Sequence, residues 1–109
     1  MAGKAMDIKL ILRELKEGLE KLYGARLRGV YLFGSRARGD AAVDSDIDIA
    51  VVLDDFLSEY EEIRRWSPLA STIGLRYDCV PSLTPVREAE WRGQPDSFLY
   101  NLHREGVAV

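Results

Sequence analysis

The chain has 109 residues, of which 47% are hydrophobic and 30% are charged. This length and balance predict one small globular domain over residues 1–109. The net charge of −3 argues against an extended basic surface that tracks long nucleic acid. No apolar run approaches the ~20 residues of a membrane span, and nothing resembles a signal peptide. We therefore expect a cytoplasmic protein without membrane contact.

The first half of the chain predicts a helix followed by two strands. From Met6 to Tyr23 apolar residues recur in steps of four and three, which indicates one face of a helix; they are Ile8, Leu12, Leu15, Leu19 and Leu22. Gly24 is placed to end this helix. Residues 28–33 (RGVYLF) and 46–53 (DIDIAVVL) are typical of buried strands. The second is expected to be buried on both faces except at its acidic start.

The second half predicts a long helix and a third strand. Residues 56–73 have helical spacing, through Tyr60, Ile63, Ala70 and Ile73, after a capping box of Ser58 and Glu61. Pro68 is expected to kink or split this helix. Residues 75–83 (LRYDCVPSL) are predicted as a strand that reaches the sheet edge at Pro81.

The C-terminal part predicts two further helical segments. A short helical turn is expected over residues 85–91, and a last helix over 97–105 between an N-cap at Asp96 and Gly106. The order helix, strand, strand, helix, strand, helix predicts a small α/β (α+β) domain with a mixed sheet.

Two acids at the start of the second strand are the first candidates for chemistry. Asp46 and Asp48 are two apart, so their side chains point to the same face, with Cα atoms about 7 Å apart. Adjacent carboxylates repel each other unless a cation compensates. Mg²⁺ fits because it takes oxygen ligands and keeps positions open for phosphates. Solvated carboxylates at a strand end are the structural alternative.

The turn after the first strand is a candidate phosphate site. Gly34 lets the backbone approach a ligand closely, and a short helix beginning at Ser35 would direct free N–H groups to the same place. Arg36 and Arg38 could neutralise phosphate, although surface or acid-pairing roles are the alternative.

A third acid, Asp78, lies in the predicted third strand. Beside the second strand it could ligate metal or accept a proton from an attacking hydroxyl. A salt bridge to Arg76 or Arg28 is the structural alternative.

The remaining distinctive side chains are assigned structural roles. Cys79 is the only cysteine, so an internal disulfide is excluded, and its apolar surroundings predict a buried thiol. His103 is expected at a surface or boundary position. Trp66 and Trp91 are expected in the core or facing a partner rather than stacking on a nucleotide.

Taken together, Gly34-Ser35, ten residues, then Asp46-Ile47-Asp48 resembles the G-S-x10-D-x-D signature of polymerase-β-like nucleotidyltransferases. FGSRARG and SDIDIAVVL are similar to the minimal nucleotidyltransferases, or MNT proteins. The resemblance extends over about residues 6–107. It implies the polymerase-β-like nucleotidyltransferase fold, a small mixed sheet with helices on one side.

The resemblance also implies the site. Gly34 and Ser35 would hold the phosphates of ATP or another NTP, Asp46 and Asp48 would bind two Mg²⁺ ions, and Asp78 would be the third family acid. In the family, MNT proteins often pair with a HEPN protein, a helical RNase toxin that they neutralise as antitoxins by docking or adenylylation. We expect AMP transfer to such a partner within a homo- or hetero-oligomer. The alternatives are a docking module without catalysis and transfer to a small molecule such as an antibiotic.

Overall fold

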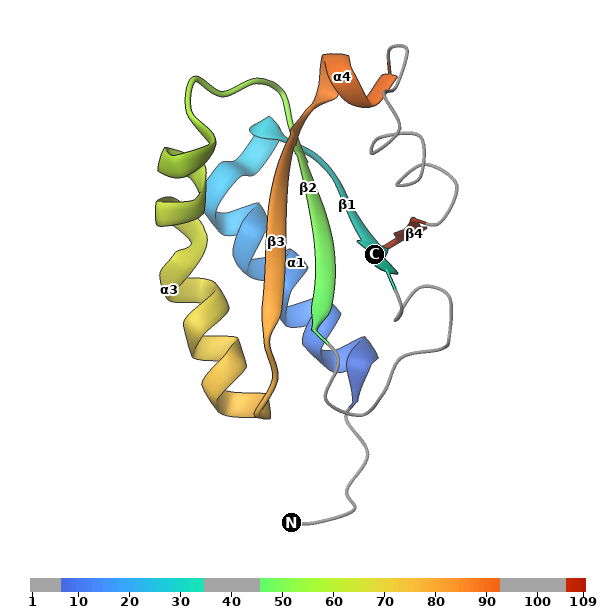
Figure 1. Cartoon of the computed structure of the whole chain (residues 1–109), viewed down its shortest axis with the longest axis vertical. Coiled ribbons are helices and arrows are strands. Elements are labelled where there is room, and N and C mark those ends of the chain that lie inside the picture. The colour runs from blue at the N-terminus through green and yellow to red at the C-terminus, as the bar shows by residue number, and fades with distance from the viewer. Residues whose placement is uncertain (1–6, 35–45, 93–105) are drawn as a thin grey trace.

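The fold is a four-stranded mixed sheet with two long helices on one face (Figure 1). The structure, a computed structural model, describes residues 7–34, 46–92 and 106–109. Its elements are, in chain order, α1 (Ile8–Tyr23), the 3₁₀ turn η1 (Gly24–Arg26), β1 (Leu27–Phe33), β2 (Ile47–Leu53), α3 (Glu59–Tyr77), β3 (Pro81–Arg87), α4 (Glu88–Arg92) and β4 (Val107–Ala108). The predicted helix over 97–105 and its cap Asp96 lie outside the described residues.

The sheet has the strand order β3-β2-β1-β4. β1 is antiparallel to both β2 and β4, and β2 is parallel to β3. A parallel pair needs a long crossover, which α3 provides between β2 and β3. The predicted mixed α/β sheet is thus confirmed.

The main core lies between the sheet and the two long helices. Alternate residues of β2, Ile47 through Leu53, pack against the buried faces of α1 and α3. On α1 the buried face is centred on Ile11, Leu15 and Leu19. The buried face of α1 differs from the predicted one at its C-terminal end, because Leu22 is 41% exposed and Tyr23 is buried in its place.

Among the described helices, none is long and apolar enough to cross a membrane.

The helix α3 begins and ends later than predicted. Ser58 caps it by accepting a hydrogen bond from the backbone N–H of Glu61, as the capping box predicted. The helix continues through Pro68 as one element instead of splitting there. Its core side chains are Trp66 and Ile73, together with a buried glutamate described below. Two residues of the predicted apolar face, Tyr60 and Ile63, are instead exposed.

The third strand was predicted too early in the chain. Residues 75–77 form the last turn of α3, and Asp78 ends the helix in the left-handed conformation with φ 54° and ψ 54°. The strand β3 starts at Pro81, and it lies at the sheet edge, as Pro81 had suggested. Cys79 is half-buried between the two elements rather than fully buried.

A fourth strand, β4, was not predicted at all. Its two residues pair with Tyr31 and Leu32 of β1. The pairing is extended by a hydrogen bond from the backbone N–H of Val109 to the carbonyl of Val30. The chain near its C-terminus thus returns to the side of β1 away from β2.

One buried ionisable pair joins the two long helices. Glu62 on α3 is only 3% exposed, and the hydroxyl of Tyr23 on α1 donates to its Oε1 over 2.9 Å. The pKa of Tyr23 is raised above its ordinary value, mainly by burial and to a smaller extent by this hydrogen bond to Glu62. Edge-to-face contact between Tyr23 and Trp66 completes the cluster.

Replacing Tyr23 by Phe should destabilise the fold. At pH 7 we expect the free energy of unfolding to fall by about 1–3 kcal/mol, because Glu62 would stay buried without its donor. The pH dependence follows from the raised pKa. Above about pH 10, where unfolded tyrosine ionises, the unfolded chain releases a proton that folded Tyr23 keeps, so wild-type stability falls as pH rises.

Urea unfolding at pH 7 and between pH 9 and 11 measures both effects. The variant should lack the part of the alkaline decline that comes from Tyr23. Equal stability of the two proteins at pH 7 would show that Glu62 gains nothing from the Tyr23 hydroxyl.

Candidate functional site

The two acids lie at the start of β2, on the face of the sheet that α1 and α3 leave uncovered. Successive strand side chains alternate between faces. Ile47 and Ile49 are completely buried in the core with the helices. Asp46 and Asp48 therefore point to the opposite face, where Asp46 is exposed and Asp48 is half-buried. The predicted placement of both carboxylates on one face is thus consistent with the strand register.

The neighbouring strands supply the surroundings of Asp48. It pairs with Phe33 of β1 on one side and Ser82 of β3 on the other. Sequence reasoning did not single out Ser82, because its position depends on a register that no local signal reveals. Further along the same face the acids give way to a small apolar cluster, which consists of Ala50, Val52, Val86, Tyr31, Phe33 and Trp91.

The glycine of the predicted turn lies directly against Asp48, one of the two acids. Gly34 follows β1 with φ 73°, a conformation that L side chains rarely adopt. A Cβ added at Gly34 would lie 2.5 Å from Oδ2 of Asp48. Gly34 and Asp48 have thirteen residues between them along the chain, yet the two are packed against each other. A side chain at position 34 would therefore displace the Asp48 carboxylate.

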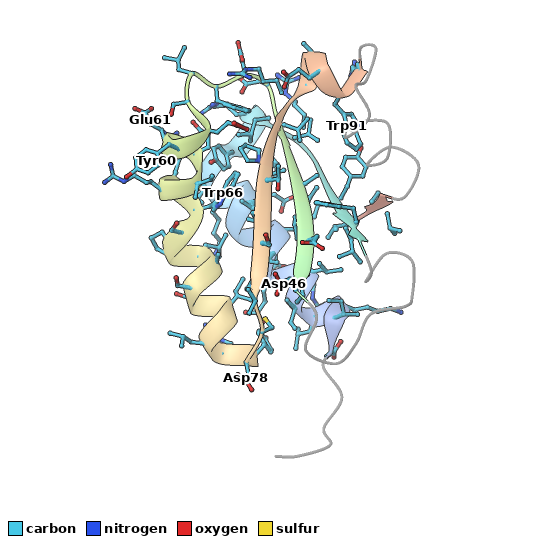
Figure 2. All side chains as sticks on the ribbon, viewed as in Figure 1. Asp46, Tyr60, Glu61, Trp66, Asp78 and Trp91 are labelled. Atoms are coloured by element: carbon cyan, nitrogen blue, oxygen red, sulfur yellow. The ribbon has the colours of Figure 1, made fainter. Side chains whose placement is uncertain are left out.

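The third predicted acid lies at the same end of the sheet, but not on a strand. Figure 2 shows Asp46 and Asp78 at the lower end, beside the starts of β2 and β3. Asp78 is exposed at the end of α3. The salt-bridge alternatives are taken by other residues, since Arg76 pairs with Glu14 and Arg28 with Glu88.

The donor set fits Mg²⁺. Asp46 and Asp48 offer carboxylate oxygens, the ligands that this ion prefers, at an accessible edge where water and phosphate could complete its shell. Over residues 7–34, 46–92 and 106–109 no three acidic, histidine or cysteine side chains lie close enough together to hold a metal ion, so Asp78 is not gathered with Asp46 and Asp48 into a three-acid cluster. The predicted phosphate ligands Ser35, Arg36 and Arg38 lie outside the described residues and stay predictions.

Comparisons with known proteins agree with the site that the structure shows. The nucleotidyltransferase domain family matches residues 12–101 of the chain. A candidate protein adenylyltransferase of Methanocaldococcus jannaschii is 32% identical over 104 residues, covering 95% of this chain and 100% of the relative. Protein adenylyltransferase MntA of Thermococcus cleftensis is 39% identical over 74 residues, covering 68% of this chain and 73% of the relative.

A solved structure shares the fold. A chain of a toxin–antitoxin MntA–HpeT mutant complex superposes with a TM-score of 0.61 at 26% identity, covering 95% of this chain and 72% of the other. Sequence, fold and site geometry agree: this chain belongs to the nucleotidyltransferase domain family, as a minimal nucleotidyltransferase related to the protein adenylyltransferases.

Proposed function

We propose that this chain transfers AMP from ATP to a hydroxyl group of a partner protein, and that the partner is a HEPN-type toxin which the chain neutralises. Relatives named as protein adenylyltransferases support the reaction, and the MntA–HpeT toxin–antitoxin complex supports the kind of partner. The contact between Gly34 and the Asp48 carboxylate carries the proposal. It puts Gly34, in the turn where we propose that phosphate binds, against the acidic start of β2.

The reaction is an in-line displacement. The acceptor oxygen forms a bond to the α-phosphorus while the bond from that phosphorus to the bridging oxygen breaks, so that pyrophosphate leaves and the hydroxyl proton passes to a base or to solvent. Asp46 and Asp48 would hold two Mg²⁺ ions, which when bound supply charge for the attacking and leaving oxygens. The Gly34 turn, with Ser35, would position the triphosphate through backbone N–H groups.

Label transfer tests this function. The chain is incubated with α-labelled ATP, Mg²⁺ and the protein of the adjacent reading frame, which we expect to be of HEPN type. Label should appear on that protein, and chelation of Mg²⁺ should abolish it. If the protein stays unlabelled with each of the four NTPs, the proposed function is wrong.

We propose Asp78 as the third catalytic acid. Its position at the end of α3 allows its carboxylate to be removed with little effect on the fold. Asparagine and glycine both tolerate the left-handed backbone that Asp78 adopts. Asp78→Asn and Asp78→Gly should therefore leave the free energy of unfolding within about 1 kcal/mol of wild type. If the carboxylate binds metal, both variants should lose label transfer by about 10²-fold or more, because several kcal/mol of transition-state stabilisation disappear.

The two variants serve as controls for each other. They alter the helix end differently but remove the same carboxylate. Wild-type transfer rates in both would restrict the catalytic acids to Asp46 and Asp48.

A further inference from the structure

The place beside Asp48 on the neighbouring strand β3 is occupied by a serine. In the parallel pair of β2 and β3, Asp48 and Ser82 are register partners (Figure 1). Leu83, the next residue of β3, packs against the main core, so the side chain of Ser82 points to the opposite face of the sheet. Asp46 and Asp48 point to that same face. The exposed hydroxyl of Ser82 therefore lies on the acid-bearing face, one strand away from Asp48.

The backbone around Ser82 is fixed relative to the start of β2. The N–H of Ile47 donates to the carbonyl of Val80 over 2.9 Å, which sets the register at the first residues of both strands. Pro81 stands directly before Ser82, and its ring restricts φ at that position. The hydroxyl of Ser82 is thus confined to the side of Asp48, and only rotation about its χ1 bond remains.

This placement brings a metal ion on Asp48 within reach of the Ser82 hydroxyl. Neighbouring strands lie about 4.8 Å apart, and Mg²⁺ lies about 2.1 Å from its oxygen ligands. A serine hydroxyl has lone pairs for a metal and a proton to donate. Thr84, the next residue of β3 on this face, pairs with Ala50 and lies about 6.6 Å farther along the strand. Among the hydroxyls of β3, that of Ser82 is therefore the one beside Asp48.

We propose that Ser82 is a further protein group of the metal site, and that its hydroxyl binds the Mg²⁺ held by Asp48 directly or through one water molecule. Two carboxylates leave most of the octahedral positions of Mg²⁺ open, so a neutral oxygen can be added without further repulsion between acids. This inference rests on the proposed function and deepens it by naming a residue that holds the metal. It is independent of the role proposed for Asp78, whose carboxylate comes from the end of α3.

Ser82→Ala removes the hydroxyl and keeps the Cβ. Because Ser82 is exposed, the midpoint of urea unfolding should stay as in wild type. We expect the Kd for Mg²⁺, measured by calorimetry on the full chain without nucleotide or acceptor, to rise by about tenfold or more. Thr84→Val is the matched control, because it removes a hydroxyl from the same strand and face but away from Asp48. It should leave the Kd for Mg²⁺ unchanged.

Ser82→Cys tests the contact by metal preference, which a merely structural role would not change. A thiolate binds Zn²⁺ well and Mg²⁺ poorly. The variant should lower the Kd for Zn²⁺ by about tenfold or more relative to wild type and raise the Kd for Mg²⁺, whereas Thr84→Cys should do neither. Cys79 is present in all of these proteins, so its contribution cancels in the comparison.

Two results would overturn the role of Ser82. They are an unchanged Kd for Mg²⁺ in Ser82→Ala, and a gain in Zn²⁺ affinity that is as large in Thr84→Cys as in Ser82→Cys. Neither titration depends on label transfer. Absence of labelling by the wild type would therefore contradict the proposed function, while the metal titrations would still decide whether Ser82 belongs to the site.

Discussion

Asp46→Asn should abolish nucleotide transfer while leaving the fold intact. Asparagine has the size of aspartate but lacks its charge, and Asp46 is exposed directly before β2, where a change of similar size is accommodated. Loss of a metal ligand removes several kcal/mol of transition-state stabilisation, so the rate of label transfer should fall by about 10³-fold. The unfolding midpoint should not fall, since removal of one of two adjacent acids relieves repulsion.

Asp54→Asn is the control for this substitution. Asp54 follows β2 at its other end, where the backbone N–H of Asp55 and the Arg26 guanidinium hold its pKa below the ordinary value. The same chemical change there should leave transfer unaffected. Equal activity of Asp46→Asn and wild type would remove Asp46 from the catalytic site.

The variant with both Asp46 and Asp48 changed to Asn separates catalysis from docking. If the chain acts by adenylylation, this variant should fail to protect cells from the partner toxin even though it still binds it. Full protection by the double variant would favour the alternative of a docking antitoxin.

Gly34→Ala should disable the site by a steric route. The new methyl group would lie 2.5 Å from Oδ2 of Asp48, so the carboxylate has to move. Misplacement of a catalytic group by about 1 Å can cost 10²-fold in rate, and we expect a loss of that order or more. The positive φ of Gly34 adds a cost of about 1–2 kcal/mol in the free energy of unfolding.

Gly24→Ala is the control that measures the cost of a positive φ alone, without a steric contact. Gly24 also has a positive φ, 55°, but a Cβ there would meet nothing within 4 Å. This variant should lose stability and keep the transfer rate of the folded protein. If Gly34→Ala and Gly24→Ala retain the same activity, contact with Asp48 is not what requires glycine at position 34.

The part of the fold that carries the acids could be predicted from the sequence. The helix α1 and the strands β1 and β2 are long, strongly periodic segments, and their bounds agree with prediction to within two residues. Alternation within β2 places both acids on one face without any knowledge of the neighbouring strands. The spacing from Gly34 to Asp48 is likewise a property of the chain itself.

The segment between α3 and β3 could not be predicted in the same way. Residues 75–83 contain apolar and β-branched side chains in a short run, and such runs suit a helix end and a strand equally well. What decides the boundary is Asp78 in the left-handed conformation, with the chain packed onto Gly74. This moved the third acid from the strand interior to an exposed helix end.

The sequence by itself determined the acid pair, the glycine turn and the strand–turn–strand unit that joins them. These depend on backbone periodicity and spacing, which are local. Only the tertiary structure decided that β3 starts at Pro81, that two residues of β4 pair with β1, and that Ser82 lies beside Asp48. Those features depend on strand register and on packing between segments that are distant in the sequence. The free energy of such contacts cannot be judged from any one segment alone.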